Sequence, residues 1–98
     1  MKIPDKLKIL AHTYTVDIDV ELLISTPCMG SCCPNLLKIK IADGIPESNQ
    51  ADTLVHEILE ALNYQLELGM EHNVISSLSA SLLTVIRDND LDLRAKIR

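Results

Sequence analysis

Ninety-eight residues are enough for one domain with a modest core and too few for two, so the sequence predicts a single domain over residues 1–98. A hydrophobic fraction of 47% excludes a disordered chain, and because Phe and Trp are absent the core must be largely aliphatic. The net charge is -5, and the Lys and Arg residues are scattered or terminal, which argues against a nucleic-acid partner.

The apolar and cysteine patterns bear on where the protein is found. No apolar run approaches the roughly 18 residues that a membrane span requires, and residues 1–5 lack the apolar centre of a signal peptide. Cys28, Cys32 and Cys33 lie in one short segment, unlike the spread framework of a secreted disulfide scaffold. We therefore expect a cytoplasmic protein with free thiols and no membrane partner.

Alternating apolar and polar residues predict three β-strands in the first half of the chain. This period of two is typical of half-buried strands, and it occurs over residues 7–10, 14–20 and 37–41. Residues 11–13 are a short link that fits a tight hairpin. Residues 25–35 hold two prolines and a glycine and are expected to form a loop. The strands should pair as a small antiparallel three-stranded sheet.

Helical periodicity predicts two helices in the second half. Ser48 is the expected N-cap of the first, and Gly69 its expected C-terminal stop. The second should run from about residue 75 to residues 88–89, followed by a charged, frayed tail over residues 90–98. Strands grouped before helices give an α+β domain in which two packed helices cover one face of the sheet. The expected apolar positions are Val55, Ile58, Leu59, Leu62 and Leu66 on the first helix, and Ile75, Leu78, Leu82, Val85 and Ile86 on the second.

The first predicted helix carries a near match to the zinc-protease pattern H-E-x-x-H, in which two imidazoles one turn apart hold zinc and the Glu is the general base. The chain has His56 and Glu57, but Glu60 stands where the second His is expected. Residues four apart share a helix face, so His56 and Glu60 can reach one ion. The same three residues also fit the polar face of an ordinary soluble helix, and their spacing alone leaves both interpretations open.

A catalytic zinc site usually needs a third protein ligand, and two histidines and one carboxylate are an established set. The other imidazoles of the chain belong to His12 and His72. His72 can reach Glu60 if the first helix frays near Tyr64 and the following residues turn back. If the helix continues to Leu68, His72 begins about 12 Å away along the axis. The turn between the helices therefore decides the ligand set.

Four segments resemble one group of proteins: residues 46–48, 53–63, 68–72 and 83–89. Through them the whole chain resembles the small zincin-like proteins found among bacteriophage and prophage genes, which are minimal relatives of metallopeptidases with a short antiparallel sheet and a metal-binding helix. In many members the pattern is similar to H-E-x-x-H, followed by an acidic residue near the position that corresponds to residue 72 of this chain. In this chain the two ligand types look exchanged between positions 60 and 72.

The resemblance implies that His56, Glu60 and His72 bind one Zn²⁺ ion and that Glu57 is the catalytic base of a metallopeptidase, with the bacterial host's cytoplasm as the location. The alternative function is a non-catalytic, phage-derived interaction module that keeps the fold with or without metal. The sequence does not indicate which peptide or protein would be the substrate or partner, and it does not indicate the oligomeric state. Possible oxyanion donors are His12, Tyr14 and Tyr64.

Two further features have more than one interpretation. The segment of Cys28, Cys32 and Cys33 could hold a second metal with His12 or water, carry reactive thiols, or be an ordinary loop, since its spacing matches no established template. Asn63 lies two turns from His56, where it could orient a ligand or simply face solvent.

Overall fold

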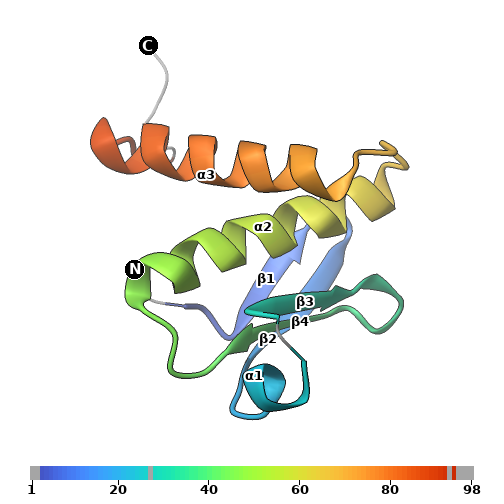
Figure 1. Cartoon of the computed structure of the whole chain (residues 1–98). Helices are drawn as coiled ribbons and strands as arrows, with labels where there is room; N and C mark the ends of the chain where they lie inside the picture. Colours follow the sequence, from blue (N-terminus) through green and yellow to red (C-terminus); the bar gives the residue numbers. More distant parts are fainter. Residues whose placement is uncertain (1–2, 27, 93, 95–98) are drawn as a thin grey trace.

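The computed structural model describes residues 3–26, 28–92 and 94, which form an α+β domain with a sheet, a helix packed on it, and a second helix packed on the first (Figure 1). The elements in chain order are β1 (Lys6–Ile9), β2 (His12–Asp19), α1 (Leu22–Ser25), β3 (Gly30–Cys33), the short 3-10 helix η1 (Pro34–Leu36), β4 (Lys38–Ala42), α2 (Glu47–Gln65) and α3 (His72–Asp88).

The sheet is four-stranded and mixed, so the prediction of three antiparallel strands was wrong. The strand order is β1-β2-β4-β3, with β1 and β3 at the edges. β1 pairs antiparallel with β2, and β3 pairs antiparallel with β4, but the central pair of β2 and β4 is parallel. The chain leaves β2, forms β3 on the far edge and then turns back, which makes β4 run in the same direction as β2.

The predicted loop over residues 25–35 contains the missed strand. β3 begins at Gly30 and ends at Cys33, directly before η1. Leu37 follows η1 with a positive φ of 54°, which reverses the chain into β4. The hairpin between β1 and β2 is also tighter than expected, because its turn is Leu10 and Ala11 and His12 is already paired with Ile9.

The core lies between the sheet and α2. Tyr14, Ile39 and Ile41 are fully buried on the sheet, and Leu54 and Ala61 meet them from α2. The core is aliphatic as predicted, apart from the single ring of Tyr14. α2 is therefore fixed on the sheet by its own apolar side.

The ends of α2 differ from the prediction. The helix begins at Glu47 with Pro46 as N-cap, so Ser48 lies inside the first turn and is not the cap. Pro suits this start because its fixed φ and missing N–H cost the helix nothing there. At the other end the helix stops at Gln65, four residues before Gly69.

α3 packs on α2, on the side away from the sheet, rather than beside α2 over the sheet as predicted (Figure 1). It buries only a narrow stripe that includes Ile75 and Ser79, and three of the predicted apolar positions, Leu78, Leu82 and Val85, stay exposed. Among the described residues no helix is both long and apolar enough to cross a membrane. The helix ends at Asp88, and most of the predicted frayed tail, residues 93 and 95–98, lies outside the described residues.

Candidate metal centre

His56 and Glu60 lie one turn apart on α2, on the flank of the helix that faces the start of α3. The His56 side chain is 15% exposed and that of Glu60 is 31% exposed. The Nε2 atom of His56 is 3.5 Å from the Oε2 atom of Glu60. The spacing of four residues therefore places both groups at one point, as the sequence predicts.

The turn after α2 brings His72 back to this point. Leu68 N–H donates to the Asn63 carbonyl, and Glu67 N–H donates to the Tyr64 carbonyl, which is the Schellman pattern of helix termination. Glu67 takes the left-handed conformation that this motif requires, with φ at 51°. Gly69 adds a second positive φ, of 67°, and α3 then begins directly at His72.

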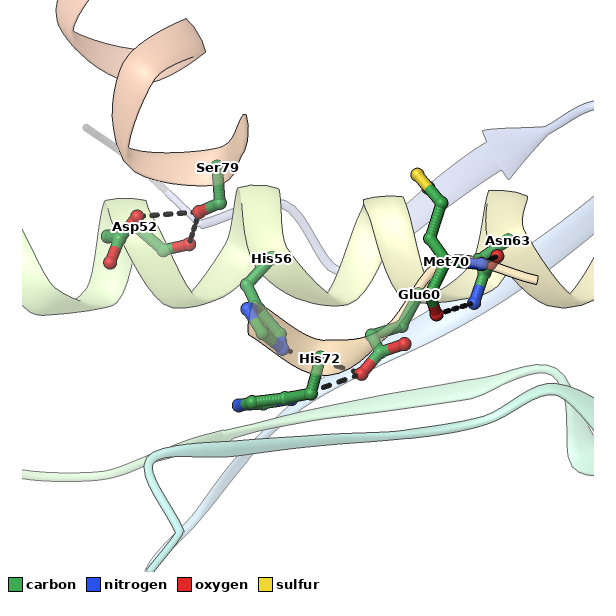
Figure 2. Close-up of polar contacts among 7 residues, drawn as sticks. All are labelled: Asp52, His56, Glu60, Asn63, Met70, His72 and Ser79. Carbon is green, nitrogen blue, oxygen red and sulfur yellow. Dashed lines mark hydrogen bonds and ion pairs between the residues drawn. The ribbon is translucent and has the colours of Figure 1, made fainter. Parts of the chain in front are cut away.

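The three predicted ligands come together. His72 Nδ1 is 3.7 Å from Glu60 Oε2, and the two imidazole rings are 4.8 Å apart between centroids (Figure 2). One ligand atom from each of His56, Glu60 and His72 lies within 4.8 Å of the others, so this group could hold a metal ion. Of the two geometries left open by the sequence, the returning turn is the one observed.

Glu57 lies beside this group but points to the sheet. The residue as a whole is only 6% exposed, and its carboxylate stands against Gly30 of β3. A Cβ atom at Gly30 would clash with Thr53 and lie 3.0 Å from Glu57 Oε2, so only glycine lets the strand approach α2 this closely. Burial, together with the negative charge of Glu60, raises the pKa of Glu57 to about 7.

Two hollows flank the ligand group. The first, of about 290 Å³, is lined by residues of α2, α3 and the start of β3, among them His56, Glu57 and His72. The second, of about 300 Å³, is lined by Glu60, Tyr64 and Cys32 among others. The ligand group thus lies between two open spaces that small molecules or side chains can enter.

The three cysteines are free thiols and are not part of the ligand group. Cys28 lines the first hollow and Cys32 the second. Burial and the charges of Glu57 and Glu60 raise the pKa of Cys32 to about 12, so this thiol stays protonated and is a poor nucleophile. Among the described residues no second group of His, Cys, Asp or Glu has ligand spacing, so the predicted alternative of a cysteine metal site gains no support.

The possible oxyanion donors now separate. Tyr14 is fully buried, and its hydroxyl accepts a hydrogen bond from Gln65 Nε2 at 3.0 Å. Tyr64 is exposed beside Glu60 in the second hollow, where its hydroxyl donates to Asn35 Oδ1 at 2.7 Å. His12 starts β2 and is not part of the ligand group. Tyr64 is therefore the one of the three that lies near the group.

Two polar contacts that the sequence did not predict connect α2 to the loop before His72 and to α3. Asn63 binds the backbone of Met70 through both atoms of its side-chain amide. Ser79, fully buried on α3, lies with its hydroxyl 2.6 Å from the Asp52 carboxylate (Figure 2). A helical spacing of seven places Asn63 on the His56 side of α2, but the sequence carries no sign of its partner, because the partner is backbone.

No protein family, no curated protein and no solved structure gave a significant match to the chain. The function is therefore inferred from the geometry of the site together with the sequence pattern of residues 56–60.

Proposed function

We propose that the protein binds one Zn²⁺ ion through His56, Glu60 and His72 and is a small zincin-like metallopeptidase with Glu57 as its general base. The observation that carries the proposal is the convergence of these three ligand atoms within 4.8 Å from two separate helices. Two histidines and one carboxylate, with room for water, are the donor set of several catalytic zinc sites.

Two of the three separations between ligand atoms are close to those around a zinc ion. Ligands about 2.1 Å from a tetrahedral ion are about 3.4 Å from one another. The distances from Glu60 Oε2 to His56 Nε2 and to His72 Nδ1 are 3.5 and 3.7 Å, close to that value. In the absence of an ion, the same distances are those of ion pairs between Glu60 and protonated imidazoles. Measuring the zinc content distinguishes a metal site from such ion pairs.

The position and the pKa of Glu57 support its proposed role as general base. It lines the same hollow as His56 and His72, and a pKa of about 7 lets it accept a proton near neutral pH. A bound zinc ion would supply Lewis-acid polarisation of a carbonyl and of a water molecule in that space. Tyr64, on the other side of Glu60, is placed to donate a hydrogen bond to a developing oxyanion if it leaves Asn35.

The edge strand β3 supports an extended peptide as substrate. The N–H of Ala42 donates to the Met29 carbonyl, and hydrogen bonds alternate along an antiparallel pair. The backbone groups of Gly30 and Cys32 therefore face the open edge of the sheet, and Gly30 also lines the first hollow. A peptide that pairs with this edge as an added strand would pass beside Glu57.

The alternative is a non-catalytic interaction module that keeps the fold. One observation favours it: α3 exposes a row of large aliphatic side chains on the side not covered by α2, and such rows often mark contact surfaces. The residues are Val74, Leu78, Leu82 and Val85. A module of this kind does not need Glu57.

Zinc content and peptidase activity of purified variants test the proposal. We expect about one zinc per purified wild-type chain and full zinc in His12→Ala, which is a matched histidine outside the group. His56→Ala and His72→Ala should retain little zinc through purification, because the two remaining ligands bind the ion only weakly. Glu57→Gln should keep zinc and lose hydrolysis of a fluorogenic peptide mixture, because only the proton acceptor is removed.

The outcomes have distinct meanings. A wild-type protein without zinc, in which His56→Ala changes only stability, would show that the three residues form ion pairs and no metal site. Zinc binding with no hydrolysis in either wild type or Glu57→Gln would favour the interaction module.

A further inference from the structure

The position of His72 needs an explanation, because its surroundings do little to hold it. Its side chain is 76% exposed, so packing does not fix the imidazole. His72 is the first residue of α3, and the N-cap residue Glu71 makes no side-chain capping hydrogen bond. The start of α3 is therefore not anchored by the cap that fixes many helix N-termini.

Asn63 supplies an anchor two residues before His72. Its Nδ2 donates to the Met70 carbonyl at 3.1 Å, and its Oδ1 accepts from the Met70 N–H at 2.9 Å (Figure 2). Both polar atoms of one side chain thus bind the two backbone groups of one residue, which fixes the orientation as well as the distance. Asn63 is part-buried on α2, three residues after Glu60, and so belongs to the same rigid helix as two of the ligands.

The loop between α2 and α3 does not fix its own conformation, so the contact with Asn63 can restrict it. Between the end of α2 and His72, two residues have a positive φ, Glu67 and Gly69. Glycine loses more conformational entropy on folding than any other residue, so without an anchor the loop can adopt many conformations. The Ser79–Asp52 contact joins the same two helices about two turns further along α3, where it holds the helices together but does not touch the loop.

We propose that Asn63 is a positioning residue, which sets the third ligand by holding the backbone of Met70 so that His72 stands opposite Glu60. The inference rests on the proposed metal site, and it adds a specific role for the loop. Because Asn63 already orders residues 66–71 in the metal-free protein, less conformational entropy is lost when His72 binds the metal ion.

A double-mutant cycle on zinc affinity tests this role. Zn²⁺ dissociation constants are measured by competition with a chromophoric chelator for wild type, Asn63→Ala, His72→Ala and the double variant, each confirmed as folded by circular dichroism. We expect Asn63→Ala to weaken zinc binding by roughly 10-fold, as changes behind metal ligands commonly do. In the His72→Ala background the same change should have no effect, because the ligand that Asn63 positions is gone.

Two further variants separate positioning from general damage. Asn89→Ala is the matched control, since Asn89 is exposed at the far end of α3 and its Nδ2 binds the Val85 carbonyl within the helix. It should leave zinc affinity unchanged. Asn63→Leu removes both hydrogen bonds but keeps a side chain branched at Cγ, and Leu is a better helix former than Asn, so a loss of helix stability would not explain weaker zinc binding. It should weaken binding as Asn63→Ala does.

Each outcome decides. Unchanged zinc affinity in Asn63→Ala, or an equal loss in the His72→Ala background, overturns the inference while leaving the metal site intact. Failure of both Asn63 variants to fold also overturns it, because the contact would then serve the fold rather than the ligand. No zinc binding by the wild type overturns both the inference and the proposed function.

Discussion

Glu57 is the residue whose environment departs most from that of an ordinary helix surface. It is a carboxylate on α2 that faces inward, against Gly30, while Glu60 one turn later reaches solvent. Burial disfavours the charged form, and the neighbouring carboxylate adds to the effect, so the pKa rises from 4.5 to about 7. The protein therefore holds a proton at this point that the unfolded chain would release.

This difference predicts a pH-dependent stability in protein freed of metal by a chelator. Below about pH 4.5 both states are protonated, and between 4.5 and about 7 only the folded state keeps the proton. The free energy of unfolding should therefore fall as the pH rises through this window, by up to roughly 3 kcal/mol. Urea unfolding at pH 5 and pH 8 measures it.

The matched variant for this prediction is Glu57→Gln, which is neutral at every pH. It should lose less stability than wild type between pH 5 and pH 8. If the two proteins show parallel pH profiles, Glu57 titrates near its ordinary value and is not the desolvated group that the structure shows.

At the scale of single elements, the end of α2 departs most clearly from expectation. Gly69 is the residue that a sequence argument selects as the stop, because glycine adopts the left-handed conformation without strain. The helix instead ends at Gln65, and Glu67, two residues before Gly69, adopts the left-handed conformation that terminates it. An L-residue pays about 1–2 kcal/mol for it.

Replacement of Glu67 by glycine should therefore stabilise the protein. We expect a gain of about 0.5–1 kcal/mol, the relief of strain being partly offset by the greater freedom of glycine in the unfolded chain. Chemical denaturation measures the change. Glu67→Ala is the control, since it removes the same charge but keeps the Cβ atom, and a gain of equal size in this variant would assign the effect to charge.

The sequence was most informative where one residue determines its neighbour's position. The alternating residues of β1, β2 and β4 and the i,i+4 pair of His56 and Glu60 follow directly from backbone periodicity. β3 was not predicted, because a strand of only four residues in a segment with two prolines is too short to show a period of two. His72 stayed undecided because its position depends on a turn whose key residue, Glu67, is not a usual choice for it.

For the whole molecule, the candidate site joins parts that are otherwise weakly connected. α3 packs on α2 and lies away from the sheet, so its hold on the domain depends on the surface between the two helices. A metal ion at His56, Glu60 and His72 would add a cross-link between α2 and the first residue of α3. Ligand binding to the folded state alone should then stabilise the entire chain.

We expect zinc at 100 times its dissociation constant to add about 2.7 kcal/mol to the free energy of unfolding. For a chain of this size that corresponds to a rise in Tm of roughly 10–20 °C. Differential scanning calorimetry with and without zinc, and again after a chelator, measures it. His72→Ala should show a much smaller rise, and an equal rise would place the ion elsewhere.

The parallel pairing of β2 with β4 also has a consequence for how the chain folds. β1 with β2, and β3 with β4, are neighbours in sequence and can close early as two separate hairpins. The seam between them pairs Val16 with Ile39 and Ile18 with Ile41, across more than twenty residues. Closing that long loop is the costly step in building the sheet. β3, which lines the candidate site, is joined to the rest of the sheet only through this seam. We therefore expect the site to be completed only after the two hairpins meet.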